Sequence, residues 1–483
     1  MNQLMRCMQC VFLLAAMAIP AAAQSDTSSG IYQDASGSSS GMVSLPAQSP
    51  YAGSVPEAAP TPGVLSLTLQ DAIQRGLQRN LGLLLSSDAT IRARSERWKE
   101  LSELLPNVSG GVSESVQQIN LQALGLRSSP ALPVPKVVGP FNYFAVNGYW
   151  TQTVFNLKAI GKERAATQGL RAAQYSYKDA RDLVVLAAGN AYLRTLSSAA
   201  RVDTAQAQVT TADTLYQKTA DQQKAGVSPA IDTLRARVEL QTRQQQLIVA
   251  RNDLAKDKLG LARVIGLATG QQFELADSVP YAPLAGLGLE ESLKQAYASR
   301  GDYLAAQSQV RAAELSHKAA TAAYLPSLSI SSQVGDLGIT PSNSHGTFAV
   351  TGTLSFPIFQ GKLHADSLEA DAALRQSQQQ LDDLRGRIDY EVRTAFLDLA
   401  ASADQVEVAR SSVDLAEQTL VQARDRFAAG VTDNLEVVQA QESLANAHEQ
   451  YISSLYAHNL AKVAIARALG FAEEGVKQYL KGK

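Results

Sequence analysis

The residue types that most often carry out chemistry are not arranged for it in this chain. No glycine-rich phosphate loop, nucleophile motif or pair of catalytic carboxylates occurs. No two histidines have metal-ligand spacing, and His448 and His458 lie ten positions apart on one expected helix. The sequence therefore predicts no enzymatic activity, no cofactor and no bound metal, and the histidines are interpreted as surface or helix-packing residues. The other three are His317, His345 and His364.

The bulk composition points to an exported protein without a nucleic-acid partner. The 483 residues carry a formal charge of −2, with no basic excess. Residues 1–23 have a basic start, an apolar run and an Ala-rich end, which predicts a secretory signal peptide. A membrane anchor is the alternative, but the run is shorter than the ~20 residues that span a bilayer. Both cysteines, Cys7 and Cys10, fall inside the signal, so the mature chain has none.

The chain is an internal duplication. Gly226 and Gly430 lie 204 positions apart in matching Ala-Gly-Val segments, while Leu105-Pro106 and Leu325-Pro326 lie 220 apart. The difference of 16 residues falls between positions 106 and 148. A long repeat of this kind implies two copies of one structural unit.

The repeat defines the expected domains. Residues 24–64 are rich in Ser, Gly, Pro and Ala and are predicted to be a disordered leader. The remaining segments are the first repeat at 65–270, a linker at 271–286, the second repeat at 287–470 and a short tail at 471–483.

Each repeat is expected to be dominated by very long helices. No proline occurs between Pro140 and Pro229 or after Pro357, and residues 158–225 and 362–429 are rich in Ala, Gln and Arg. At about 1.5 Å per residue, each helix would extend on the order of 100 Å. Both end at Ala-Gly-Val, a helix-stop signal, before a returning helix at 229–266 and 433–470.

Helical seams and breaks are also visible. Along the last helix Ala440, Ala447, Ser454 and Ala461 recur every seven residues, a small-residue seam that permits close helix approach. A helix is expected to begin at Thr68, with breaks near 80–82 and, in the second copy, near 300–301. A soluble helical hairpin would explain the seam.

Strands follow each Leu-Pro, where the apolar period changes to two. They are predicted at about 106–122, 141–155, 326–338 and 346–357. Strict alternation marks strands between an apolar and a polar environment, which a soluble hairpin does not explain. We expect Thr351 and Thr353 to face a lumen and the apolar set to face lipid. That set is Phe144, Val146, Trp150, Phe348, Val350 and Leu354.

Four strands with an apolar face cannot close a barrel alone. An open sheet edge in lipid leaves unpaired backbone groups that cost several kcal/mol each. Pooling strands from several identical chains satisfies these groups. The sequence thus favours an oligomeric barrel joined to long helices.

The combination resembles the TolC-like outer-membrane efflux protein family. The resemblance covers nearly all of residues 65–470 and rests on the duplication, the Leu-Pro pairs and the paired Ala-Gly-Val tips. Phe356–Gly361, FPIFQG, closes the second strand pair where the family usually has a PLFDGG-like motif. The first copy, Thr153–Asn156, is degenerate and has Leu157 in place of the glycine.

The resemblance implies a mostly α fold with a small membrane β part. Duplicated helical hairpins would form a periplasmic tunnel, and a homotrimer would build a twelve-strand barrel in outer-membrane lipid. The implied function is the exit duct, for small molecules or proteins, of a tripartite efflux pump or type I secretion system. Its implied partners are a periplasmic adaptor and an inner-membrane transporter. The alternative class is a secreted or periplasmic coiled-coil scaffold without a conduit.

The resemblance also implies roles for residues at the tips, although each has a simpler interpretation. The periplasmic constriction maps onto Asp232, Phe427 and Glu436, which could instead be ordinary helix-surface residues. The tip glycines could be plain helix C-caps as well as adaptor contacts. The implied adaptor-contacting set is Gly226, Val227, Ser228, Gly430, Val431 and Thr432.

Overall fold

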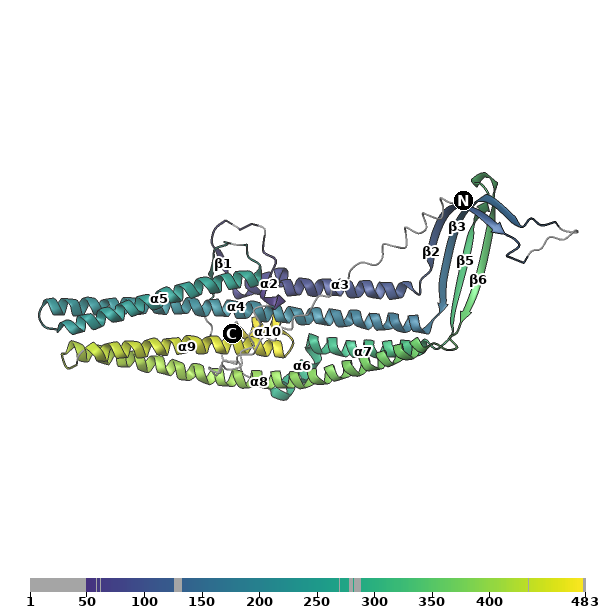
Figure 1. The fold of residues 1–483 in the computed structure, drawn as a ribbon. Coiled ribbons are helices and arrows are strands. Elements are labelled where there is room, and N and C mark those ends of the chain that lie inside the picture. Colours follow the sequence, from purple (N-terminus) through teal and green to yellow (C-terminus); the bar gives the residue numbers. More distant parts are fainter. Residues whose placement is uncertain are drawn as a thin grey trace, which may run out of the picture. The chain divides into compact units, whose positions relative to one another are not determined.

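The two halves of the chain fold into the same series of elements (Figure 1). The computed structural model describes residues 49–483 except 58, 61, 126–132, 269, 278–280, 282–287, 433 and 481–483. The predicted signal peptide and the predicted leader up to residue 48 lie outside the described residues. The first half contains η1 (Pro50–Ala52), β1 (Leu65–Leu67), α2 (Leu69–Arg79), α3 (Leu81–Ser102), β2 (Asn107–Asn120), β3 (Val137–Phe155), α4 (Leu157–Lys224), α5 (Ala230–Ile265) and β4 (Phe273–Leu275). The second contains α6 (Leu289–Ser299), α7 (Gly301–Ala322), β5 (Ser327–Gly338), η2 (Pro341–Asn343), β6 (Ser344–Ser355), α8 (Gly361–Ala428), α9 (Asn434–Ala468) and α10 (Ala472–Leu480).

The long helices confirm the helical expectation. α4 and α8 each have 68 residues. Their tip-side parts pair with the shorter returning helices, α5 and α9, and their sheet-side parts lie beside α3 and α7 (Figure 1). Within the described part of the chain, no helix combines the length and apolarity needed to cross a membrane.

The predicted helix breaks occur at equivalent positions in the two repeats. Thr68 caps α2 through a reciprocal pair of hydrogen bonds with Asp71. Asn80 and Arg300, 220 positions apart, both take extended backbone conformations between two helices and are buried. The Asn80 side chain accepts a hydrogen bond from the Gly82 N–H and donates one to the Tyr51 carbonyl. The Asn80 side chain at the break is therefore hydrogen-bonded to one neighbouring and one distant backbone group.

Small side chains pack the last helix against its neighbours, as the heptad pattern predicts. Ala440, Ala447, Ser454 and Ala461 on α9 are all buried. The largest apolar core lies around the middle of the long helices and includes residues of β1, β4, α2 and α10. Close packing of these side chains contributes to the stability of the single chain.

The four longer strands form one antiparallel sheet in the order β2-β3-β5-β6. The bounds differ from the expected ones by a few residues. β3 begins at Val137, not 141, and β6 covers Ser344–Ser355, not 346–357. β6 ends before Pro357 because proline has no N–H to donate to the ladder.

The predicted disordered leader is wrong for its last part. Val55 N–H donates to the Arg79 carbonyl at 2.9 Å, and Glu57 forms an ion pair with Arg75 at 3.2 Å. These contacts hold residues 49–57 against α2 and the end of α5. Composition could not predict them because their partners are backbone groups and side chains of other elements.

The linker and the tail also contain regular structure that the sequence did not suggest. β4 lies inside the predicted 271–286 linker and pairs in parallel with β1, in the register Leu65 to Phe273. Helix α10 occupies most of the predicted 471–483 tail and buries Ala472 and Val476. Three-residue strands and a nine-residue helix are too short for a periodic signal to appear in the sequence.

A group of buried ion pairs joins the two repeats near the helix breaks. The fully buried Arg300 guanidinium contacts Asp302 of α7 and Glu391 of α8, each at 2.7 Å. Arg467 of α9 contacts Asp179 of α4 at 2.6 Å. The Arg300 and Arg467 side chains are 2% and 13% exposed, so removing their acidic partners would leave a buried positive charge without compensation.

One buried carboxyl beside this group lacks a full set of partners. Asp182 of α4 accepts a hydrogen bond from the Ala472 N–H at the start of α10, while its Oδ2 has no hydrogen-bond partner among the described residues. Burial raises the pKa of Asp182 to about 6, with Asp179 adding to the rise and Arg467 opposing it.

We predict that Asp182 makes the protein more stable in mild acid. Its folded pKa of about 6 lies above the ~3.9 of an unfolded aspartate, so only the folded state binds this proton between those values. The free energy of unfolding should therefore gain about 2–3 kcal/mol from this group as the pH falls from 7 to about 4. Asp182→Asn should remove that gain in urea unfolding followed by circular dichroism. The exposed Asp203→Asn on the same helix should leave it unchanged, and an equal effect of both variants would contradict the assignment.

Candidate functional site

The register of the sheet brings all six residues of the predicted lipid-facing set onto one face. Trp150 of β3 lies opposite Val108 of β2 and Ser332 of β5, and Ser332 lies opposite Val350 of β6. Because paired residues in antiparallel strands point the same way, even-numbered positions of all four strands share this face until the strands bulge. We call it the apolar face. Its large members include Val108, Val112, Phe144, Val146, Trp150, Leu328, Ile330, Val334, Phe348, Val350 and Leu354.

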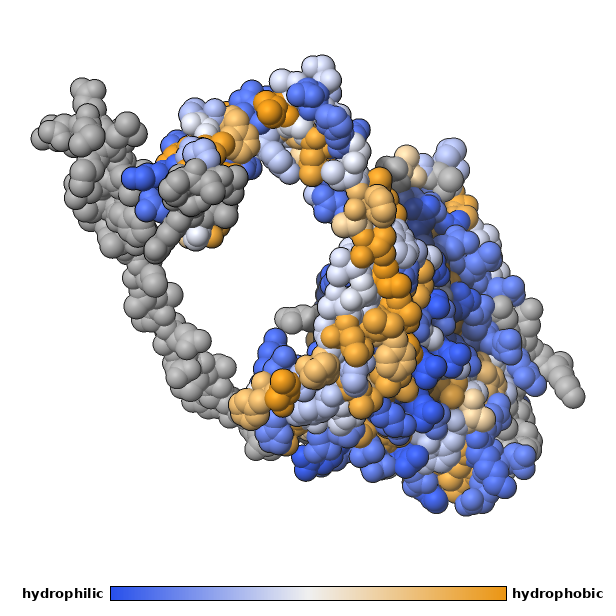
Figure 2. Space-filling model, turned by 90° about the vertical axis from the view of Figure 1, so that its right-hand side faces the viewer, coloured by the Kyte–Doolittle hydropathy of each residue, from blue (hydrophilic) through white to orange (hydrophobic). Residues whose placement is uncertain are grey.

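The apolar face is uncovered in the single chain. Phe348 is 82% exposed, and Val108, Val112 and Val334 are also exposed. Figure 2 looks onto the sheet end of the described chain, where apolar side chains gather in bands beside polar surface. A continuous apolar area of this kind on a sheet marks a contact with lipid or protein.

The opposite face of the same strands is polar. The odd-numbered positions carry mostly Ser, Thr, Gln and Asn, and Thr351 pairs with Ser331 while Thr353 pairs with Ser329. The expected lumenal residues Thr351 and Thr353 therefore lie together on what we call the polar face. Apolar residues on one face and hydroxyls on the other are the pattern of a barrel wall between lipid and water.

Both edges of the sheet are open. β2 and β6 each have a neighbour on one side only among the described residues. β2 has 14 residues and β6 has 12, so two long rows of backbone N–H and C=O groups lack ladder partners. In a membrane such rows must be paired by another strand.

The two helical tips close in the same way at the opposite ends of α4 and α8 from the sheet. Gly226 and Gly430 have φ of 72° and 74°. Val227 N–H donates to the Gln222 carbonyl, and Val431 N–H donates to the Arg426 carbonyl, both at 3.0 Å. With the glycine N–H bonds, this is the six-to-one pattern in which a left-handed glycine ends a helix.

None of the described residues covers these tips. Val227 is 75% exposed and Val431 70% exposed, and a Cβ added to either glycine would meet no other atom. The C-cap interpretation of the glycines thus has direct geometric support. An adaptor role for the same residues is compatible with this exposure and stays a prediction.

Asp232 is not the open pore acid that the sequence suggested. It is 5% exposed, accepts a hydrogen bond from the Ser228 hydroxyl at 3.1 Å, and lies 3.7 Å from Arg235. Its position in the first turn of α5 explains this burial, because a carboxylate there is stabilised by the helix N-terminus and by the preceding serine. The simpler interpretation, in which Asp232 is a solvated acid on the helix surface, does not describe this conformation either.

The other two expected constriction residues are also engaged within the chain. Glu436 forms an ion pair with Arg426 at 2.7 Å, which bridges α9 and α8 just behind the second tip. The half-buried Phe427 ring packs on a small cluster shared by both hairpins, and Lys218 Nζ lies 5.7 Å from its centre. The three residues share the tip region but do not meet one another.

Asn434 is a tip residue that the sequence did not single out. It is fully buried at the start of α9, and its Nδ2 donates to the Asp232 carbonyl of α5 at 2.8 Å. The bond connects the two hairpins directly. An Asn at the start of a helix is usually interpreted as a cap. Its bond to the other hairpin becomes visible only when the position of that hairpin is known.

The comparisons with known proteins agree with this geometry. The family model described as "Outer membrane efflux protein" matches residues 292–471. The second repeat of the chain is therefore similar to this family along nearly its whole length. Among curated proteins, the toluene efflux pump outer membrane protein TtgF of Pseudomonas putida is 24% identical, with 83% of each chain covered. The alkaline protease secretion protein AprF of Pseudomonas aeruginosa is 23% identical over 67% of this chain and 69% of that protein.

Solved structures give the fold. The CmeC outer membrane channel of Campylobacter jejuni has a TM-score of 0.73 and 17% identity, covering 84% of this chain and 86% of that one. The chain thus has the fold of these outer-membrane channels, and the relatives that it matches are outer-membrane efflux and secretion proteins, in agreement with the resemblance. The family consists of channels and not enzymes, and the scaffold alternative is set aside.

We predict that a charge is tolerated on one face of β6 and not on the other. Val350→Arg places a guanidinium on the apolar face and should lower the free energy of unfolding in phospholipid by ~2–4 kcal/mol, if position 350 lies near the bilayer midplane. The neighbouring Thr351→Arg, on the polar face, is the matched control and should cost much less. Urea unfolding from liposomes measures both. Equal costs would show that the two faces do not separate lipid from water.

Proposed function

We propose that three copies of this chain pool their strands into a twelve-strand barrel and their hairpins into one tunnel. The observation that carries the proposal is the four-strand sheet with one apolar face, one polar face and two open edges. Pairing β6 of one copy with β2 of the next removes every open edge without new secondary structure. The apolar face then contacts outer-membrane lipid and the polar face surrounds a water-filled lumen.

Exposed apolar side chains on the helices support lateral assembly. α5 exposes Val238 and Val249, and α8 exposes Leu397, Val408 and Leu415. Among the described residues, nothing buries these side chains, so in a monomer they would be exposed to water. Burying them between neighbouring copies would add to the stability that the strand pairing supplies.

The assembly predicts a defined mass. Native mass spectrometry of the detergent-extracted protein should give three chains of about the 51.4 kDa full-length mass, less the signal peptide. Heating the same sample in dodecyl sulfate should give single chains, because no disulfide is available in the mature chain. A stable monomer that keeps its full β content would refute the shared barrel.

We further propose that the protein is the outer-membrane exit duct of a tripartite assembly. The exposed tips, Gly226–Ser228 and Gly430–Thr432, are the surfaces offered to a periplasmic adaptor, which an inner-membrane transporter would drive. Small molecules are the favoured cargo, since TtgF, a toluene efflux protein by its name, matches over 83% of both chains. Protein export is the second candidate, because AprF, a protease secretion protein by its name, is also similar.

The tip region is the proposed narrow end of the tunnel. Two contacts join the hairpins there, the Asn434 bond to the Asp232 carbonyl and the packing of Phe427. The Arg426–Glu436 ion pair joins the two helices of the second hairpin. Glu436 keeps part of its carboxylate exposed, whereas Asp232 does not. If three copies surround the pore, Glu436 is therefore the acid that passing ions would sense.

This difference predicts unequal effects of two similar substitutions. Glu436→Gln should lower cation selectivity in planar bilayers, because it removes an exposed negative charge and leaves Arg426 without its partner. Asp232→Asn is the buried control and should change selectivity much less. Phe427→Ala should raise conductance if the ring narrows the opening. Should Asp232→Asn have the larger effect, or should none of the variants differ from the parent protein, the pore would be lined by other residues.

A further inference from the structure

Both faces of the sheet become mixed in character at the end away from the helices. On the apolar face, Glu114 lies opposite Phe144, and Asp336 lies opposite Val146. On the polar face of the same region, the strands carry Phe141, Tyr143 and Leu337. Charged residues are costly in lipid, so the lipid band should end near the Glu114 and Asp336 rows. The aromatic residues behind them then have no lipid-related role.

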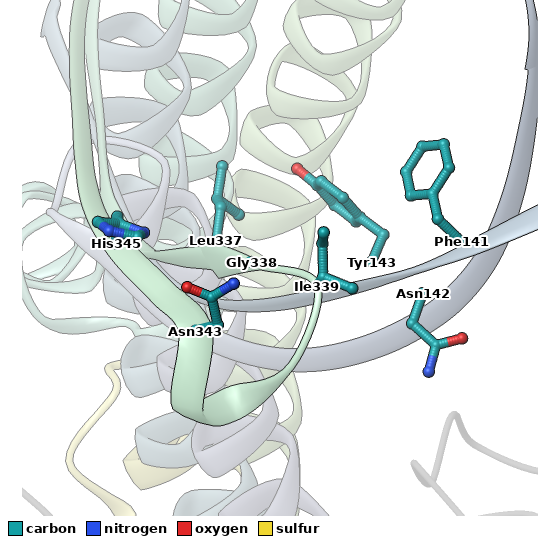
Figure 3. Close-up of a pocket in the computed structure, with 8 residues that line it drawn as sticks. All are labelled: Phe141, Asn142, Tyr143, Leu337, Gly338, Ile339, Asn343 and His345. Carbon is teal, nitrogen blue, oxygen red and sulfur yellow. The ribbon is translucent and has the colours of Figure 1, made fainter. Parts of the chain in front are cut away.

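These apolar side chains line a hollow at the β5–β6 turn. Its volume is about 350 Å³, and its walls include Phe141, Tyr143, Leu337, Ile339, Asn343 and His345. Figure 3 shows Phe141, Tyr143, Leu337 and Ile339 projecting to the same side of the strands, and Asn142 to the other. The hollow is open to solvent, with a mostly apolar lining and a few polar groups, so it can contact one side of a small molecule and does not enclose it.

We propose that this outer hollow binds neutral aromatic small molecules at the mouth of the channel before they are released. The site rests on the proposed function, because its ligands would arrive through the lumen that the polar face surrounds. None of the described residues lining the hollow is Asp, Glu, Lys or Arg, so it offers no ion pair to a charged cargo.

The side chains suit such a ligand in two ways. Phe141 and Tyr143 are two residues apart on β3, so their rings stand side by side on one face and can pack against a planar ring. Asn343 and His345 line the hollow at the other end, beyond Leu337, and supply hydrogen-bonding groups for a hydroxyl or carbonyl on the ligand (Figure 3). Elsewhere the polar face carries mostly Ser, Thr, Gln and Asn, which would not retain an aromatic molecule.

Single-channel recording in planar bilayers tests the site. With 2-naphthol added on the outer side, the parent protein should show transient partial blocks that an equal concentration of glucose does not produce. The double variant Phe141→Ser and Leu337→Ser should weaken the apparent affinity for 2-naphthol about tenfold, because it removes apolar contact area. Phe144→Ser is the matched control, since it removes an aromatic ring from the same strand on the opposite face.

The outcomes separate the site from the conduit. Currents that 2-naphthol never blocks, or blocks that persist equally in the double variant, would overturn the site alone. A loss of block with Phe144→Ser as large as in the double variant would also overturn it. A parent protein that carries no current would overturn the conduit and the site together. Circular dichroism and the native mass of each variant show that the barrel is intact.

Discussion

The hydrogen-bonding demand of the backbone in lipid controls the rest of this structure. A sheet of four strands that presents Val108, Val146, Val350 and their neighbours to an apolar environment cannot leave the edges of β2 and β6 unpaired there. Closure with other copies of the chain solves this problem. In the proposed assembly, closure also brings the hairpins of several chains together, which would give the exposed apolar residues of α5 and α8 a partner.

The duplication is the reason that so much of the fold could be predicted from the sequence. Gly226 and Gly430 mark equivalent helix ends, and both take the left-handed conformation that a helix stop requires. Asn80 and Arg300 occupy equivalent helix breaks, although the Asn80 amide bonds to a backbone carbonyl and the Arg300 guanidinium to a carboxylate. The period-two alternation in 347–355 was enough to assign the two faces of the sheet, because a strand has no other way to separate apolar from polar side chains.

Contacts between elements far apart in the sequence could not be predicted. The contact between the two hairpins at the tips is one case, because Asn434 reaches the Asp232 backbone from 202 residues away. β1 and β4 are three residues each and are visible only as a pair across 208 positions. The composition of residues 49–57 is typical of disorder, yet hydrogen bonds and an ion pair attach this segment to α2 and the end of α5. In each case the stabilising group belongs to a neighbour that no local pattern identifies.

Equivalence by duplication also has a limit, which two lysines 204 positions apart illustrate. Lys258 of α5 donates to the Phe273 carbonyl at 3.2 Å and lies over the ring of that residue. Lys462 of α9 is 1% exposed and has no hydrogen-bond partner among the described residues, so burial lowers its pKa to about 8. The two lysines occupy equivalent positions in the two repeats. Their surroundings differ because β4 follows the first returning helix while α10 follows the second. The repeats therefore share their helices and strands, and they differ where the segments between and after them fill the space around the core.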